Sequence, residues 1–275
     1  MLKMACLIRE RPPIVWFVNN LHKRHPISLL VVERRVPGKG FLRKLSRLEI
    51  GPAIAGARYY VENRFRARDE IVECNRVLGD GWQEIDKTIP TLVTSDINAA
   101  AVANALREMS PDVLVDHGTS LVKDNITATA PVALNLHWGL SPYYRGGNCT
   151  EWALILWDPL NIGVTIHSLA KRIDGGDIVA QARARVTAQD TATSLNLQLS
   201  KLGTDLMGKA LDRLALGRGL VFHPQDFSQG PLLSARQWSP ELRAQVRRIE
   251  KHGLVAVMLG NPSRRSPLPI VESLE

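Results

Sequence analysis

The fold is decided by residues 131–142, which read Pro-Val-Ala-Leu-Asn-Leu-His-Trp-Gly-Leu-Ser-Pro. The apolar start of this stretch predicts a strand, and Asn135 and His137 stand two residues apart at its end. Alternate residues of a strand point to the same face, so the two polar side chains are predicted to lie together. The Gly-Leu-Ser-Pro that follows cannot continue a strand. The pair is therefore predicted at a strand's carboxyl end, where open parallel sheets bind ligands.

Strands and helices alternate around this stretch. Residues 1–8 and 27–32 are predicted strands, and residues 15–22 a helix that begins no earlier than Pro12-Pro13. Such a β-α-β opening is typical of a parallel sheet. The other predicted strands are 91–94, 113–116, 163–169 and 178–181. The other predicted helices are 98–109 capped by Ser95-Asp96, 151–157, 194–216 capped by Asp190 or Thr193, and 240–251. The predicted fold class is α/β, a Rossmann-like and mostly parallel sheet.

The chain changes character after Gly217, which ends the longest predicted helix. Beyond it the elements are shorter and spaced by proline, without the makings of a separate core. We therefore expect a main domain over residues 1–217 and a small C-terminal appendage over 218–275. The basic region 36–75 has mixed periodicity and is predicted to be a helical excursion.

Composition indicates a soluble protein. The 275 residues are 45% hydrophobic and 23% charged, with no apolar run near the roughly 18 residues of a spanning helix. The apolar start is too short for a signal peptide, and the three cysteines lack CxxC spacing. We expect a cytoplasmic protein with no membrane contact. Phosphate-loop, GxGxxG and HExxH motifs are missing from the sequence, and no metal is expected.

The net charge of +8 admits two kinds of partner. A basic chain attracts nucleic acids or small polyanions, and basic residues crowd segments 34–47 and 243–265. Solvated surface faces explain both clusters better than a binding site does. A basic nucleic-acid-binding protein stays open as the non-enzymatic alternative, and it would bind with a steep salt dependence.

Amide, imidazole and carboxylate groups suffice for acyl transfer to an amine. The carboxylates come from Asp174-Gly175-Gly176-Asp177, a turn between two predicted strands that lacks calcium-loop spacing. Singly, such residues are more often turn-formers or structural side chains. Cys149 has no basic partner in adjacent sequence and is predicted to pack rather than act as a nucleophile.

The joint pattern is more specific than its parts. Asn-x-His is followed by Ser-Pro, an aromatic pair and Arg-Gly, then by a Gly-x-Thr-x-His strand ending at His167 and by the Asp-Gly-Gly-Asp turn. This pattern resembles the 10-formyltetrahydrofolate-dependent formyltransferase family, densely over about 112–200. The resemblance implies 10-formyltetrahydrofolate as co-substrate, no metal, and Asn135, His137 and Asp174 as catalytic residues. It also implies that two segments surround the pterin, with the contacts Thr119, Ser120, Leu121, Val122, Leu169, Ile173 and Asp177.

The expected roles follow from the chemistry of formyl transfer. Asn135 would donate to the oxyanion, and loss of such a donor typically costs about 10²–10³ in rate. His137 would donate beside it as imidazolium or accept the amine's proton as neutral imidazole. Asp174 would hold the His137 tautomer or relay the proton through water.

The acceptor follows from the resemblance alone. The sequence from Trp138 to Gly146 is most similar to the corresponding stretch of enzymes that formylate nucleotide-linked amino-dideoxy sugars. This resemblance implies a role in cell-surface polysaccharide (O-antigen) synthesis. The substrate contacts would be Trp138, Tyr143, Tyr144 and Arg145.

Other acceptors and assemblies stay open. Transfer to tRNA is disfavoured because residues 218–275 are too few for the extra barrel of such enzymes, so no nucleic-acid partner is expected. Residues 9–13 replace the glycine-rich turn of glycinamide ribonucleotide enzymes. Formylation of that ribonucleotide or of hydroxyornithine, and hydrolysis of the folate, stay alternatives; the hydrolases usually carry an additional N-terminal domain. A homodimer is also left open.

Overall fold

A seven-stranded sheet forms the centre of the computed structural model, which describes residues 2–34, 70–234, 237–261, 266–272 and 274. The strand order is β3-β2-β1-β4-β5-β7-β8. The strands are β1 (Met4–Ile8), β2 (Ile27–Glu33), β3 (Thr91–Thr94), β4 (Val113–His117), β5 (Val132–His137), β7 (Gly163–Ser168) and β8 (Ile178–Arg183). The first five in sequence pair in parallel, whereas β7 runs antiparallel to both β5 and β8. The predicted α/β fold with a mostly parallel sheet is confirmed.

The strand order reverses beside β1. The chain leaves β1 toward β2 and β3 and then returns to place β4 on the other side of β1. Open α/β sheets bind ligands outside the carboxyl ends of the strands at such a reversal. β4 and β5 end at this edge, so the residues that close them lie where a ligand is expected.

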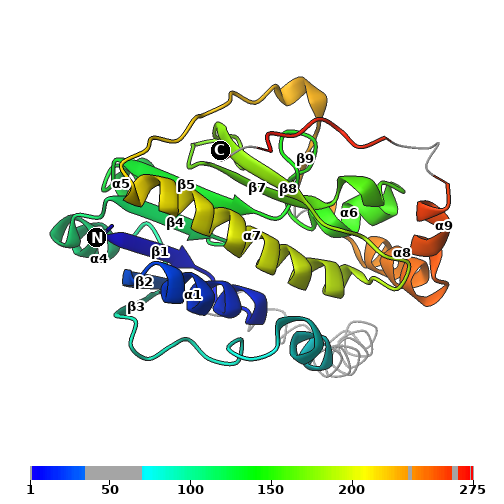
Figure 1. Cartoon of the computed structure of the whole chain (residues 1–275), viewed down its shortest axis with the longest axis horizontal. Coiled ribbons are helices and arrows are strands. Elements are labelled where there is room, and N and C mark those ends of the chain that lie inside the picture. Colours follow the sequence, from blue (N-terminus) through cyan, green and yellow to red (C-terminus); the bar gives the residue numbers. More distant parts are fainter. Residues whose placement is uncertain (1, 35–69, 235–236, 262–265, 273, 275) are drawn as a thin grey trace, which may run out of the picture.

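Helices cover both faces of the sheet (Figure 1). They are α1 (Pro12–Arg24), α4 (Ala100–Met109), α5 (Asp124–Thr127), α6 (Cys149–Ile155), α7 (Ala192–Ala215), α8 (Pro240–Lys251) and α9 (Leu254–Leu259). Residues 70–78 are also helical; the rest of the predicted excursion, up to residue 69, lies outside the described residues. The other elements of the described residues are two 3₁₀ turns, η1 (Pro159–Asn161) and η2 (Phe227–Gln229), and a short pair of strands, β6 (Arg145–Gly146) with β9 (Leu232–Leu233). In the described ranges, no helix has the length and apolar character needed to cross a membrane.

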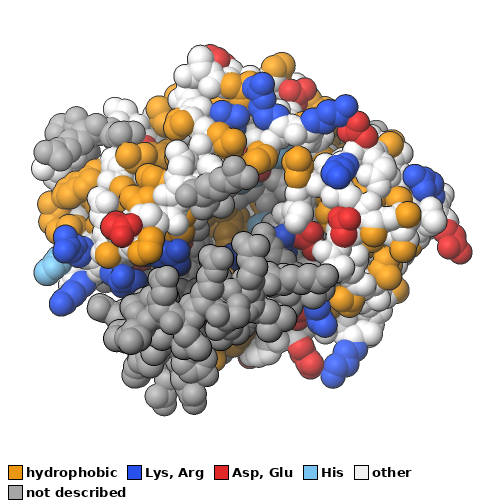
Figure 2. All heavy atoms as spheres, turned by 180° about the vertical axis from the view of Figure 1, so that it is seen from behind, with side chains coloured by type: hydrophobic (Ala, Val, Ile, Leu, Met, Phe, Trp, Pro, Cys, Tyr) orange, Lys and Arg blue, Asp and Glu red, His pale blue; other side chains and the backbone are white. Residues whose placement is uncertain are grey.

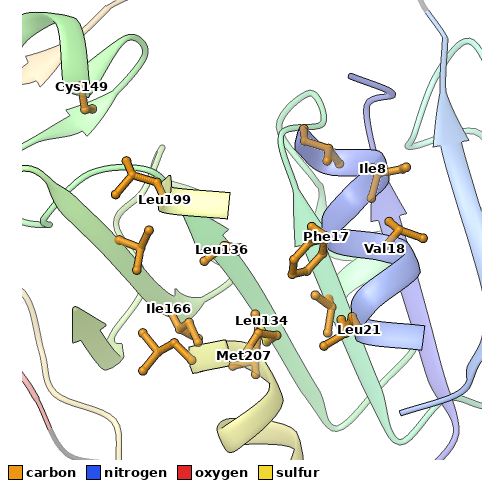
Figure 3. Close-up of a cluster of buried hydrophobic side chains, with 14 of the residues drawn as sticks. Ile8, Phe17, Val18, Leu21, Leu134, Leu136, Cys149, Ile166, Leu199 and Met207 are labelled. Carbon is orange, nitrogen blue, oxygen red and sulfur yellow. The ribbon is translucent and has the colours of Figure 1, made fainter. Parts of the chain in front are cut away.

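The larger core lies between the sheet and the helices α1 and α7. Phe17 and Leu21 of α1 and Met207 of α7 pack with Leu134 and Leu136 of β5 (Figure 3). A second cluster lies on the opposite face, between the sheet and the helices α4 and α5. Because β5 is packed from the α1 and α7 face, the position of its polar end is fixed by the core.

The ends of two helices differ from the predictions. The Ser95-Asp96 cap of α4 is wrong: the Asp96 side chain accepts from the Asn98 N–H in the turn before the helix. The cap of α7 is Thr191 rather than Asp190 or Thr193. Its hydroxyl oxygen accepts from the Ser194 N–H while the Ser194 hydroxyl accepts from the Thr191 N–H. The expected end at Gly217 is present, with a φ of +69° that favours glycine.

The residues after Gly217 pack on the main body. The buried side chains of α8 and α9 belong to the larger core, namely Val246, Ile249, Val255 and Met258. Two backbone contacts reach the outer edge of β8: His223 pairs with Ile178, and the Gln181 N–H donates to Val271 O. The division at residue 217 stays a prediction.

Candidate active site

Three neighbouring strands bring polar side chains to one level of the sheet. Asp116 of β4 stands opposite Asn135 of β5, which stands opposite His167 of β7. All three are buried, with exposed fractions of 6%, 7% and 2%. Buried polar groups need partners, so their contacts with one another define the site.

The amide of Asn135 lies between Asp116 and His167. In the orientation that pairs each donor with an acceptor, Nδ2 donates to Oδ2 of Asp116 at 2.8 Å and to its main-chain oxygen at 3.1 Å, while Oδ1 accepts from His167 Nε2 at 3.0 Å. The amide thus lies between a carboxyl group and an imidazole.

His137 points to the same side of β5 as Asn135, as the spacing of two predicts. Its Nε2 lies 2.9 Å from the carbonyl oxygen of Tyr144, so this nitrogen carries a proton. Its Nδ1 lies 3.5 Å from Oδ2 of Asp174, longer than a normal hydrogen bond. Nδ1 is therefore free to accept a proton beside a carboxylate.

Asp174 is an anion held between two histidines. Its Oδ1 lies 3.6 Å from His167 Nε2, and its Oδ2 accepts the Gly146 N–H at 2.7 Å. Burial raises the pKa of this carboxyl, but His137, His167 and the Gly146 N–H together lower the pKa to about 2. Asp174 is therefore ionised at neutral pH, as the predicted role requires.

Cys149 lies nearer to His137 than the sequence indicates. Its Sγ is 3.7 Å from His137 Nε2, but that nitrogen is committed to the Tyr144 carbonyl. Burial, together with Asp174 and Glu151, raises the pKa of the thiol well above its usual value. A thiol kept protonated is a poor nucleophile, so its surroundings favour the packing role.

The residues predicted to contact the folate lie in two segments beside the site. Thr119, Ser120, Leu121 and Val122 follow β4, and Leu169, Ile173 and Asp177 follow β7. A surface pocket of about 360 Å³ is lined by Leu121, Val122, Lys123, Asp124, Asn125 and Lys171, so it touches both segments. Leu121 and Ile173 are 49% and 46% exposed. Val122 is buried, and Thr119 donates to Oδ1 of Asp116 at 2.5 Å.

The four predicted acceptor contacts differ in exposure. Trp138 and Tyr143 are half-buried, and the Tyr143 hydroxyl donates to Pro269 O. Tyr144 is buried and its hydroxyl donates to Asp158, so its ring lies in the core rather than on an open face. Arg145 is also buried, with its guanidinium 4.6 Å from the ring centroid of Phe227.

Three contributions were missed by the sequence interpretation. Asp116 and His117 end β4 side by side, and two polar residues at a strand end were an available signal. Gln225 donates to the carbonyl oxygens of Asp174 and Gly176 and so holds the carboxylate-bearing loop. Gln225 lies 51 residues beyond Asp174, and its contact with that loop leaves no pattern in the sequence.

In the described ranges, basic and acidic side chains are mixed on the face shown in Figure 2. On the face shown in Figure 2, the Lys and Arg side chains that are coloured lie in several places, with Asp and Glu among them. Within those ranges, no cluster of three or more His, Cys, Asp or Glu side chains could hold a metal ion.

Comparison with known proteins identifies a region of the chain that is similar to formyl transferases. Residues 85–211 match the family model described as formyl transferase, which includes both Asn135 and Asp174. Methionyl-tRNA formyltransferase of Limosilactobacillus fermentum is 31% identical over 184 residues, which are 64% of this chain and 58% of that protein. The chain thus spans less than two thirds of that relative's length.

Solved structures share the fold. An N-formyltransferase from Helicobacter canadensis, in complex with folinic acid and dTDP-3-aminofucose, has a TM-score of 0.55 at 15% identity, covering 87% of this chain and 73% of its own. Glycinamide ribonucleotide transformylase 1 from Symbiobacterium toebii has a TM-score of 0.53 at 18% identity, covering 82% and 95%. Residues 85–211 therefore match the formyl transferase family, and the resemblance read from the sequence is confirmed.

Proposed function

We propose that this protein transfers a formyl group from 10-formyltetrahydrofolate to a primary amine. One observation carries the proposal: Asn135, His137 and Asp174 meet at the carboxyl end of β5, within the residues that match the formyl transferase model. An amide donor, a base and a carboxylate are the groups that acyl transfer to an amine uses.

His137 and Asp174 act together in the proposed reaction. Nε2 of His137 donates to the Tyr144 carbonyl, so Nδ1 accepts the proton of the attacking amine. The imidazolium formed in this way is stabilised by the ionised Asp174, whose Oδ2 lies 3.5 Å from Nδ1. Asn135 donates from Nδ2 to a carbonyl oxygen on which negative charge develops.

The co-substrate supplies the activated formyl group when it is bound. The exposed Leu121 and Ile173 suit an apolar ring system, and the 360 Å³ pocket also contains Lys123 and the ion pair of Lys171 with Asp124. We assign its binding to the two segments after β4 and β7, with the contacts Thr119, Ser120, Leu121, Val122, Leu169, Ile173 and Asp177.

The proposed acceptor is a nucleotide-linked amino-dideoxy sugar. Support comes from the stretch from Trp138 to Arg145, in which Trp138 and Tyr143 keep part of their rings exposed. An enzyme of the same fold was crystallised with dTDP-3-aminofucose. Methionyl-tRNA is a second candidate, because a methionyl-tRNA formyltransferase is 31% identical over 184 residues. A cytoplasmic location and a role in O-antigen synthesis stay predictions.

The test is formylation of a panel of amines. The protein is incubated with 10-formyltetrahydrofolate and, separately, with amino-sugar nucleotides, glycinamide ribonucleotide, hydroxyornithine, methionyl-tRNA or buffer, and products are identified by mass. We expect a mass increase of one formyl group on an amino-sugar nucleotide. Formylation of methionyl-tRNA alone would replace the proposed acceptor, and folate turnover without any formylated amine would indicate a hydrolase.

Two variants test the assigned residues. His137→Gln and Asp174→Asn are each expected to lower kcat by about 10²-fold or more, the usual contribution of general acid–base groups. Cys149→Ala is the matched control: it removes a side chain that also contacts His137, and kcat should stay close to the wild-type value. Near-wild-type turnover of His137→Gln would contradict the catalytic assignment.

A further inference from the structure

Arg145 is a buried cation that forms no ion pair with a carboxylate of the described residues. It is only 6% exposed, and its guanidinium donates from Nε to Pro142 O at 3.3 Å and from Nη2 to Gly230 O at 3.0 Å. A buried charge is costly unless an opposite charge compensates it, and neutral carbonyl groups compensate it only in part. A bound anion would therefore neutralise a charge that the fold has already desolvated.

Arg172 brings a second guanidinium to the same aromatic ring. The ring centroid of Phe227 lies 4.6 Å from Cζ of Arg145 and 4.3 Å from Cζ of Arg172. Arg172 is exposed, and its side chain makes no ion pair or hydrogen bond within the described ranges. An arginine stacked on a ring keeps N–H groups at its edge for an acceptor. One ring thus holds two cations that can both still donate.

The loop that carries Asp174 fixes the second arginine. A Cβ built on Gly175 would lie 2.8 Å from Cγ of Arg172 and 2.9 Å from its Cδ, so the arginine stem packs directly on this glycine. The segment that carries Phe227 is tied to the same loop, because Nε2 of Gln225 donates to Asp174 O at 3.0 Å. The ring and the second arginine are therefore held together by contacts on both segments.

The carboxylates nearest in sequence to this arginine pair have other partners. Asp174 lies between two histidines, and Asp226 accepts from the hydroxyl and the N–H of Ser228. Burial and the charge of Arg172 lower the pKa of Arg145, whereas Asp174 raises it. The two guanidiniums repel each other, and an anion with two negative charges would be attracted by both.

We infer that Arg145 and Arg172, held on the ring of Phe227, bind a phosphate group of the acceptor substrate. The assignment to the acceptor rests on the proposed function. The residue after Arg145, Gly146, donates its N–H to Oδ2 of Asp174 at 2.7 Å, so the arginine pair lies beside the proposed catalytic carboxylate. A nucleotide-linked amino sugar carries its diphosphate and its amine on one sugar ring. Guanidinium forks bind phosphate oxygens through paired hydrogen bonds, which would hold that ring with the amine toward Asp174.

Binding of inorganic pyrophosphate to the full-length protein tests the site without folate or amine. Calorimetry should detect binding to the wild type, and Arg172→Met should weaken it by about tenfold, as expected for the loss of a charge-assisted hydrogen bond. Arg172→Lys keeps the charge and should recover part of the lost affinity. No binding to the wild type at millimolar pyrophosphate, or equal affinity of the wild type and Arg172→Met, overturns the inference.

The choice of Arg172 keeps binding separate from folding. Its side chain is exposed, whereas Arg145 also holds two main-chain carbonyls. Arg107→Met is the matched control, since it removes another exposed arginine, which contacts Asn104 in the same helix, α4. It should bind pyrophosphate as the wild type does. Equal weakening in both variants would show that the net charge alone attracts pyrophosphate, and the site would be rejected.

The glutamate tail of the folate is the other anion that two arginines would suit. γ-Glutamylglutamate is therefore added to the wild type in competition with pyrophosphate. We expect it to leave pyrophosphate binding unchanged. Displacement of pyrophosphate by this dipeptide would assign the arginine pair to the folate and overturn its role in holding the acceptor.

Kinetics connect the site with the acceptor. With an amino-sugar nucleotide that the wild type formylates, Arg172→Met should raise the KM for this acceptor by about tenfold and leave the KM for the folate unchanged. An unchanged acceptor KM, or a rise in the folate KM instead, contradicts the inference. If the wild type formylates no amine, the proposed function fails, and calorimetry still decides whether the arginine pair binds phosphate.

Discussion

Asp174 keeps its charge although most of its surface is buried. Burial alone would favour the neutral acid, but two imidazoles and the Gly146 N–H face its oxygens. The residue also has a φ of +45°, a conformation uncommon for a side chain larger than glycine. Strained backbone at a functional site is retained when the surrounding contacts determine it. The charge and conformation of Asp174 thus depend on the same contacts.

A stability measurement tests whether Asp174 keeps its charge in the folded protein. The folded pKa of Asp174 is lowered from 3.8 to about 2, so the unfolded chain binds the proton more tightly. The carboxylate therefore stabilises the fold above about pH 4, and this contribution disappears as the pH falls toward 2. Asp174→Asn should lower the free energy of unfolding by about 2 kcal/mol at pH 7.

Urea unfolding at several pH values provides the measurement. The difference between the wild type and Asp174→Asn should be constant from pH 5 to 7 and become smaller below pH 4. Asp177→Asn, which replaces an exposed carboxylate three residues away, should show no such pH dependence. A difference for Asp174→Asn that stays constant down to pH 3 would contradict the low pKa.

At the scale of elements, a short pairing holds the site's anion in place. Gly146 of β6 pairs with Leu233 of β9 and gives its N–H to Asp174. Its φ is +104°, and a Cβ built on it would lie 2.3 Å from Leu233 O. Glycine is required here both by conformation and by the close approach of the second strand.

Replacing each of two glycines by alanine separates the effect of the positive φ from the effect of the close approach of Leu233. Gly217→Ala introduces only the positive-φ strain, since nothing lies within 4 Å of its Cβ, and should cost about 1 kcal/mol. Gly146→Ala adds the contact with Leu233 and should cost more than about 2 kcal/mol in urea unfolding. Equal costs at the two positions would show that the β6–β9 contact can move aside.

For the whole molecule, the local sequence pattern was enough to predict the strands and helices and to place Asn135 and His137 together. The apolar run before Asn135 and the spacing of two to His137 placed both on one face of β5, because strand periodicity is a local property. The cap of α7 was assigned to the wrong residue because Asp190, Thr191 and Thr193 all carry side-chain acceptors. Which of them caps the helix depends on where the chain turns.

Contacts between distant segments could not be predicted in the same way. Asp116 faces Asn135 only because β4 and β5 are neighbours in register, and Gln225 reaches Asp174 only because the chain after α7 returns across the site. The burial of Tyr144 likewise follows from its bond to Asp158. These contacts depend on the register of the sheet and on the path of the chain.

The chain that follows α7 also covers the outer edge of β8, the last strand of the sheet. An outer strand with free backbone groups can recruit the same strand of another molecule and begin an aggregate. Here His223 and Val271 occupy backbone positions along that border. Deleting residues 266–275 should expose the backbone of β8 around Gln181 and give higher-mass species in light scattering. Val271→Ala keeps the hydrogen bond from the Gln181 N–H to the residue-271 carbonyl and should stay as monodisperse as the wild type. The C-terminal segment would then protect the protein from aggregation as well as complete its fold.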